Sequence, residues 1–198
     1  MNRYEPRQFP RLKGLSGISD EVLKNHLELY QGYVKNVNTL NEQLGALLRE
    51  GKAAGSNPAY AEMSRRLSFE YSGMVLHEYY FENIAPEPEP LSKDSALGRQ
   101  LAASYGSVDA WLTDFKAVAT MRGVGWAIAF QDPASKTIRN SWVTLHEDGN
   151  LPGYRPIVVM DAWEHAFVPD YKPTERAKYV ESYLRNLDYR ACEGRLIR

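Results

Sequence analysis

The sequence predicts an α+β fold, in which an N-terminal antiparallel helical hairpin precedes an α/β domain with a three-stranded antiparallel sheet. Two long runs of apolar residues at helical spacing fill the N-terminal half. Shorter helical patterns and three short strand-like runs follow a proline-rich segment. This change of pattern predicts two units: residues 1–86, with an N-terminal arm and the hairpin, and residues 91–198, with the sheet.

The first half is expected to hold an arm and two long helices. Residues 1–17 are rich in arginine, proline and glycine, which predicts an extended arm. Ser19 or Asp20 is a suitable N-cap for a first helix that runs to about Glu50. A short loop leads into a second helix over about 58–84, whose first residue is a proline, as suits a first turn. Two long helices with a short connection are expected to pack antiparallel.

The second half begins after a proline-rich linker. Alternate prolines at residues 85–90 end the second helix, because proline lacks the N–H that a helix requires. The elements after it are expected in the order helix, helix, strand, strand, strand, helix, at residues 95–105, 107–121, 124–131, 137–145, 157–161 and 179–187.

Composition narrows the class of protein. The chain has 198 residues, 43% hydrophobic and 25% charged, which is enough to bury a core. A net charge of -1 gives no global basic character that would indicate a nucleic-acid partner. No apolar run approaches the roughly 18 residues of a membrane span, and the N-terminus shows no signal peptide. The single Cys192 cannot form an internal disulfide, so we expect a cytoplasmic protein.

One short stretch near the end of the chain carries metal-binding chemistry. Asp161 follows a buried strand, and His165 lies four residues later. Their oxygen and nitrogen atoms are ligands that a first-row transition metal binds. A lone histidine is more often a core or surface residue than a ligand. Three further histidines, however, lie on the first helix, on the second helix and at the end of the second strand: His26, His77 and His146.

The stretch belongs to a recognisable motif. Asp-x-Trp-Glu-His-Ala at residues 161–166, followed by Asp-Tyr-Lys at 170–172, resembles the signature of the iron/manganese superoxide dismutase family. Similar segments at 32–38, 77–86 and 123–127 extend the resemblance over nearly the whole chain after the arm. Members have a helical hairpin followed by an α+β domain with a three-stranded antiparallel sheet. The resemblance implies that superoxide and protons are converted to dioxygen and hydrogen peroxide at one iron or manganese ion per subunit.

The resemblance implies a role for each histidine. The metal ligands would be His26, His77, Asp161 and His165. Tyr33 would match a gateway tyrosine that relays protons. Both metals accept this ligand set, so the choice between them stays open.

The resemblance also assigns residues around the ligands. His146 falls where members carry a glutamine or histidine that touches metal-bound solvent. Tyr30 would replace an inward histidine, and Trp126 belongs to the family's glycine-tryptophan strand. Trp163 would form one wall of the cavity around the metal. Glu164 would reach across the interface of a homodimer, or else a tetramer, to the ligand histidine of a partner subunit.

The first helix departs from the family pattern. Members usually place the ligand histidine eight residues before the tyrosine, and an ungapped count here selects Asn25, a poor ligand. His26 lies seven residues before Tyr33; on an ideal helix this spacing turns about 700°, only about 20° from the starting face. Eight residues turn about 800° and need a one-residue bulge to face the same way. We therefore prefer His26 and predict an uninterrupted α-helix over 26–33.

Two other classes of protein remain open. A dismutase-fold protein without a metal, kept for binding or structure, would follow if Asn25 rather than His26 faced the site. Another non-haem metal oxidoreductase would also use histidines and a carboxylate, but it would need a cosubstrate pocket, of which the sequence gives no sign.

The second helix also departs from the dismutase pattern. Gly73 lies at a position where some members of that family hold a solvent-binding glutamine, and the missing side chain leaves room for His146.

Overall fold

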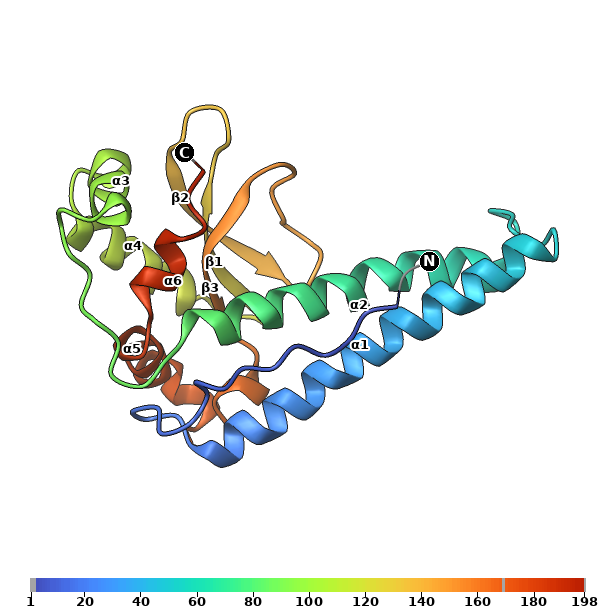
Figure 1. The fold of residues 1–198 in the computed structure, drawn as a ribbon, viewed down its shortest axis with the longest axis horizontal. Coiled ribbons are helices and arrows are strands. Elements are labelled where there is room, and N and C mark those ends of the chain that lie inside the picture. The colour runs from blue at the N-terminus through green and yellow to red at the C-terminus, as the bar shows by residue number, and fades with distance from the viewer. Residues whose placement is uncertain (1–2, 169, 198) are drawn as a thin grey trace.

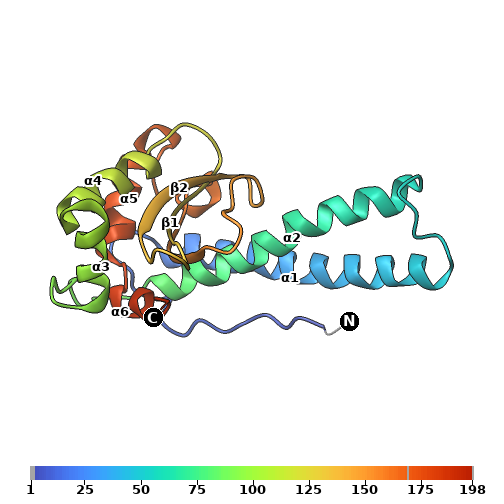
Figure 2. The same cartoon turned by 90° about the horizontal axis from the view of Figure 1, so that it is seen from above.

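The computed structural model describes residues 3–168 and 170–197. Helices α1 (Asp20–Arg49) and α2 (Pro58–Asn83) form a long hairpin, and the sheet lies over one end of it (Figures 1 and 2). Helices α3 (Ala96–Tyr105) and α4 (Val108–Ala119) follow; α4 packs on the sheet, while α2 packs along its third strand. The predicted α+β fold is confirmed.

The hairpin begins and ends at the expected signals. Ser19 is the N-cap of α1, and its Oγ accepts a hydrogen bond from the amide of Val22. Asn57 caps α2 one residue before its first-turn proline. Helix α1 is α-helical throughout, so the predicted uninterrupted helix over 26–33 is confirmed. Residues 3–9 of the arm have no regular secondary structure, as predicted, and run beside the hairpin, whereas turns and bends interrupt residues 10–17 (Figure 2). Residues 1–2 of the predicted arm lie outside the described residues.

The sheet has the strand order β2-β1-β3 and both pairings are antiparallel. Its central strand β1 is buried at every position, as a strand covered on both faces should be. Pairing places Trp126 of β1 directly opposite Asp161 of β3. The three strands span Gly125–Gln131, Ile138–Thr144 and Arg155–Asp161.

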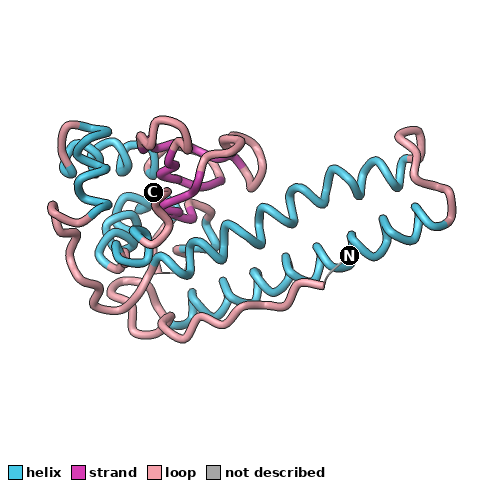
Figure 3. Tube along the Cα trace, turned by 45° about the horizontal axis from the view of Figure 1, so that its top comes forward, coloured by secondary structure: helices cyan, strands magenta, loops and turns pink. Residues whose placement is uncertain are grey.

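Several features differ from the sequence-based expectation: the helix expected at 179–187 spans Arg176–Arg185, and two 3-10 helices were not expected. Strand β3 begins at Arg155 rather than 157, because Pro156 pairs with Phe130 at a register shift where a residue without an N–H is tolerated. A short helix that the sequence did not predict closes the chain. The C-terminal elements are η1 (Glu164–Ala166), η2 (Pro173–Glu175), α5 (Arg176–Arg185) and α6 (Tyr189–Glu193). Figure 3 distinguishes the helices, strands and loops along the whole trace.

Candidate metal centre

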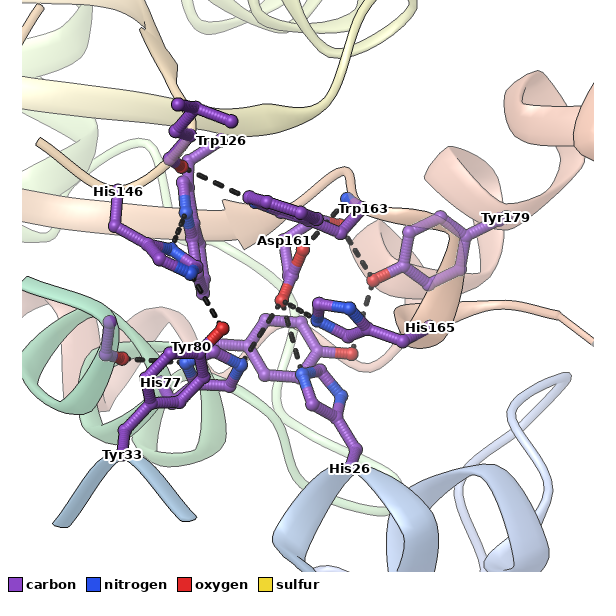
Figure 4. Close-up of polar contacts among 12 residues, drawn as sticks. His26, Tyr33, His77, Tyr80, Trp126, His146, Asp161, Trp163, His165 and Tyr179 are labelled. Atoms are coloured by element: carbon purple, nitrogen blue, oxygen red, sulfur yellow. Dashed lines mark hydrogen bonds and ion pairs between the residues drawn. The ribbon is translucent and has the colours of Figure 1, made fainter. Parts of the chain in front are cut away.

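Four predicted side chains from four elements converge below the end of β3. His26 comes from α1, His77 from α2, Asp161 from the last position of β3 and His165 from η1 (Figure 4). One ligand atom from each lies within 4.8 Å of all the others. The Oδ2 atom of Asp161 lies 3.1 Å from Nε2 of His26, 3.1 Å from Nε2 of His165 and 3.5 Å from Nε2 of His77.

These separations fit ligands around one metal ion. Metal–nitrogen and metal–oxygen bonds of about 2.1 Å, at angles of about 90–120°, place neighbouring ligand atoms about 3.0–3.6 Å apart. Nε2 of His77 is buried and has no hydrogen-bond partner among the described residues. Such unpaired buried atoms are rare and require an explanation. Three imidazoles and one carboxylate are a donor set for a first-row transition metal.

Hydrogen bonds behind the cluster fix the direction of its donor atoms. Nδ1 of His77 donates to the carbonyl of Gly73 at 2.6 Å, which leaves the Nε2 lone pair directed at the cluster. Oδ1 of Asp161 accepts from the amide of Trp163 at 2.8 Å, so Oδ2 faces the imidazoles. The hydroxyl of Tyr179 donates to the carbonyl of Asp161 at 2.9 Å. Asp161 is therefore held both through its carboxylate and through its backbone carbonyl.

The first-helix ambiguity has a clear structural outcome. His26 is 1% exposed and contacts Asp161, whereas Asn25 is exposed to solvent. Seven residues of regular helix bring His26 and Tyr33 to the same buried face, as the helical geometry requires. The condition for the metal-free alternative, Asn25 facing the site, is not met.

The buried part of the cluster favours neutral imidazoles at His26 and His77 and an ionised carboxylate at Asp161. Burial lowers the pKa of His26, and burial together with the charge of His26 lowers the pKa of His77 well below its usual value. Burial opposes ionisation of Asp161, but the charge and hydrogen bonds of His165 and of His26 outweigh it and lower its pKa far below its usual range. A neutral imidazole and an ionised carboxylate are the protonation states in which these groups bind a metal.

Beside the cluster, Trp126 determines which ring nitrogen of His146 carries hydrogen. The indole Nε1–H of Trp126, which can only donate, bonds to Nδ1 of His146 at 3.0 Å. Burial lowers the pKa of His146 to about 4, so at neutral pH the ring is neutral and its hydrogen resides on Nε2. That N–H donates to the hydroxyl oxygen of Tyr33 at 2.7 Å. The hydroxyl group of Tyr33 can therefore donate its own hydrogen to a second hydrogen bond.

This pairing uses the one N–H of neutral His146. A solvent molecule in the cavity would then be hydrogen-bonded by Tyr33 rather than by His146, which differs from the contact expected by resemblance. Burial raises the pKa of Tyr33, so its proton is retained at neutral pH. A Cβ atom at Gly73 would lie 2.8 Å from the Tyr33 ring and 3.2 Å from His146 Cδ2. As expected, glycine leaves the space that these two rings occupy.

The other predicted residues surround the cluster at different distances. The Trp163 ring stacks on His146 with centroids 4.9 Å apart, and Glu164 is exposed. Tyr30 lies farther out: its hydroxyl accepts from the amide of Arg7 and donates to Glu78, each at 2.9 Å.

Two aromatic contacts were not anticipated residue by residue. The Tyr80 ring lies 5.0 Å from His26, and the Phe69 ring lies 4.5 Å from His146. The crowding of aromatic residues on the second helix was the available signal, although it is equally typical of plain core packing.

Comparison with known proteins agrees with this geometry. Residues 93–195 match the family model described as iron/manganese superoxide dismutases, C-terminal domain. The chain is 35% identical over 175 residues to superoxide dismutase [Mn] 2 of Haloferax volcanii, covering 87% of this chain and 83% of that protein. It is 32% identical over 194 residues to superoxide dismutase [Fe] of Aquifex pyrophilus, covering 96% of this chain and 89% of that protein. The convergent ligand cluster, the fold and these matches agree: the chain belongs to the iron/manganese superoxide dismutase family.

Proposed function

We propose that the protein is a superoxide dismutase whose single metal ion is held by His26, His77, Asp161 and His165. The convergence of these four side chains, in a member of this family, carries the proposal. The reaction consumes two superoxide anions and two protons and yields dioxygen and hydrogen peroxide. Bound iron or manganese supplies one-electron redox chemistry by alternating between its +3 and +2 states.

The protein's own groups handle protons and access. Tyr33 keeps its hydroxyl proton and can present it to the cavity, because its oxygen already accepts from His146. His146 holds Tyr33 in place and is itself held by Trp126. The stacked ring of Trp163 forms a wall beside His146 and limits the space around the ligands.

We also make proposals about the identity of the metal and about the oligomeric state. Iron and manganese both remain candidates, since the similar proteins include members named for each. We propose a homodimer, with a tetramer as the alternative, in which Glu164 contacts the ligand histidine of the other subunit. Glu164 is exposed in the single chain, and the side chain of His165 is still 27% exposed. A partner over this face would complete the burial of the site.

Two further proposals concern organisation and location. We divide the chain into residues 1–86 and 91–198, with the proline-rich residues between them as the linker. We place the protein in the cytoplasm, and the single Cys192, buried with its pKa raised by burial to about 12, is consistent with that. Across the described residues, the helices are either too short or too polar to cross a membrane.

The test combines metal analysis with superoxide consumption. The purified protein should contain close to one iron or manganese ion per chain and should dismutate superoxide. The zinc-loaded protein, whose ion is redox-inert, is the negative control. His26→Ala should lose both metal and activity, whereas Asn25→Ala, its exposed neighbour, should keep both. A wild-type protein that binds neither metal and consumes no superoxide would refute the proposal.

A further inference from the structure

A buried carboxylate with a fixed partner lies on α2 outside the metal cluster. Glu70 is 2% exposed, and its Oε1 accepts from Nε of Arg66 at 2.7 Å. Its other oxygen accepts from the side-chain amide of Asn36 on α1 at 3.1 Å. Because both carboxylate oxygens are occupied by donors from the two helices, the guanidinium of Arg66 is held in one place.

The same guanidinium lies against the aromatic side chains that border the site. Its central carbon is 4.0 Å from the centroid of the Phe69 ring. The edge of Phe69 in turn meets His146, with centroids 4.5 Å apart, and its ring lies 6.2 Å from that of Tyr33. Arg66 is therefore separated from the Tyr33–His146 hydrogen bond by one ring.

The ion pair is oriented with its positive end toward solvent. The side chain of Arg66 is 51% exposed, while that of Glu70 is 3% exposed. An anion that approaches from solvent meets the guanidinium before it meets the carboxylate. The charges of the pair also reach the site: Arg66 contributes to lowering the pKa of His146, while at Tyr33 the charge of Glu70 raises the pKa and that of Arg66 opposes the rise.

We propose that Arg66 is a fixed cation beside the Tyr33–His146 pair that draws the anionic substrate toward the metal, with Glu70 as the residue that positions it. The inference rests on the proposed dismutase activity, because it supposes a small anion as substrate. An attractive charge near a site raises the local concentration of a small anion and its association rate, and salt screens the effect.

The experiment compares variants that change the charge at this ion pair in different ways. Arg66→Gln removes the cation, Arg66→Lys keeps it, and Arg65→Gln is the matched control, because Arg65 pairs with exposed Glu62 instead. Loss of Arg66 leaves the buried carboxylate unpaired, so the double variant Arg66→Gln, Glu70→Gln is made as well. Each protein is loaded to equal metal content, and kcat/KM for superoxide is measured from about 10 mM to about 500 mM ionic strength.

We expect Arg66→Gln to lower kcat/KM about two- to threefold at low ionic strength. The double variant, which also removes the negative charge of Glu70, should lower it less. The deficit should shrink to nothing at high ionic strength. Arg66→Lys keeps the charge but loses the planar guanidinium over Phe69, so it should lose less than Arg66→Gln at low salt. Arg65→Gln should match the wild type at every salt concentration. Titration with azide, a small monovalent anion, followed by absorbance, should show the same two- to threefold loss of affinity without any turnover.

Other results would overturn the assignment. A deficit that does not depend on salt, or one shared equally by Arg66→Lys, would show that Arg66 acts only through packing. Equal behaviour of Arg66→Gln and Arg65→Gln at low salt would show that position 66 has no special effect. A wild-type protein that dismutates superoxide while all variants match it refutes this inference alone, whereas an inactive wild-type protein refutes the proposed function.

Discussion

Gly73 offers a sharp test of how the site is packed. It lies inside α2, where a glycine costs about 1 kcal/mol relative to alanine, so helix propensity favours Gly73→Ala. The added Cβ would lie 2.8 and 2.9 Å from two carbons of the Tyr33 ring and 3.2 Å from His146. Non-bonded carbon atoms prefer separations of about 3.5–4.0 Å, so the Tyr33 ring must move by about 0.7 Å.

The shift of the Tyr33 ring determines how much Gly73→Ala lowers the free energy of unfolding. Overpacking in a tight interior costs about 1–3 kcal/mol. A shift of that size also stretches the 2.7 Å bond between Tyr33 and His146 beyond the normal range, which costs about 1 kcal/mol. After subtracting the gain in propensity, Gly73→Ala should lower the free energy of unfolding by about 1–3 kcal/mol. In a chain of this size that lowers Tm by about 2–12 °C.

Gly32 provides the matched control. It also lies inside a helix, α1, but nothing lies within 4 Å of the position of its Cβ. Gly32→Ala should therefore raise the free energy of unfolding by about 0.5–1 kcal/mol. Both variants are unfolded by heat in the metal-free state, so that changes in metal affinity do not enter. If Gly73→Ala is as stable as Gly32→Ala, the packing argument is refuted.

Three further predictions follow from other contacts. Trp126→Phe leaves Nδ1 of His146 without its donor, which should cost about 1–3 kcal/mol and raise the pKa of His146, measured by NMR. In His146→Gln, the free energy of unfolding should fall less steeply as the pH is lowered. The native state keeps the His146 ring neutral down to about pH 4, while the unfolded chain protonates it near pH 6.5. Stability supplied by the neutral ring is thus present above pH 6.5 and is lost as the pH falls toward 4. Tyr30→Phe removes the bonds to Arg7 and Glu78 and should cost about 1–2 kcal/mol, with faster hydrogen exchange at the Arg7 amide.

Each of these has a clear contrary result. An unchanged pKa of His146 in Trp126→Phe would contradict the assigned tautomer. Unfolding curves of the metal-free wild type and of His146→Gln that fall in parallel between pH 6.5 and 4 would contradict the linkage. Unaltered exchange at Arg7 in Tyr30→Phe would show that the arm is held by other contacts.

The parts of the site that the sequence predicted depend on local geometry. Once the resemblance supplies Tyr33 as the reference position, helical periodicity separates His26 from Asn25, because it relates positions on one element. The placement of Asp161 at a strand end follows from the apolar run before it. Both are properties of a short stretch of chain, so no knowledge of distant partners is needed.

The unpredicted parts depend on contacts between distant segments. The tautomer of His146 follows from an indole on a neighbouring strand, and the bond from Arg7 to Tyr30 joins an aperiodic arm to a helix. Helix α6 is too short for a periodic signal. Whether Phe69 packs in a core or borders a site cannot be read from the residue type, because an aromatic ring serves either purpose.

The spread of the four ligands along the chain has a thermodynamic consequence. They come from the first helix, the second helix and the last strand with its following turn, so the complete set exists only once both halves have folded against each other. An ion held by all four therefore binds the native state and not the unfolded one. Each tenfold excess of free metal over its dissociation constant adds about 1.4 kcal/mol to the free energy of unfolding. The ion would act as a reversible cross-link, so metal supply would regulate how long the protein survives as well as how fast it works.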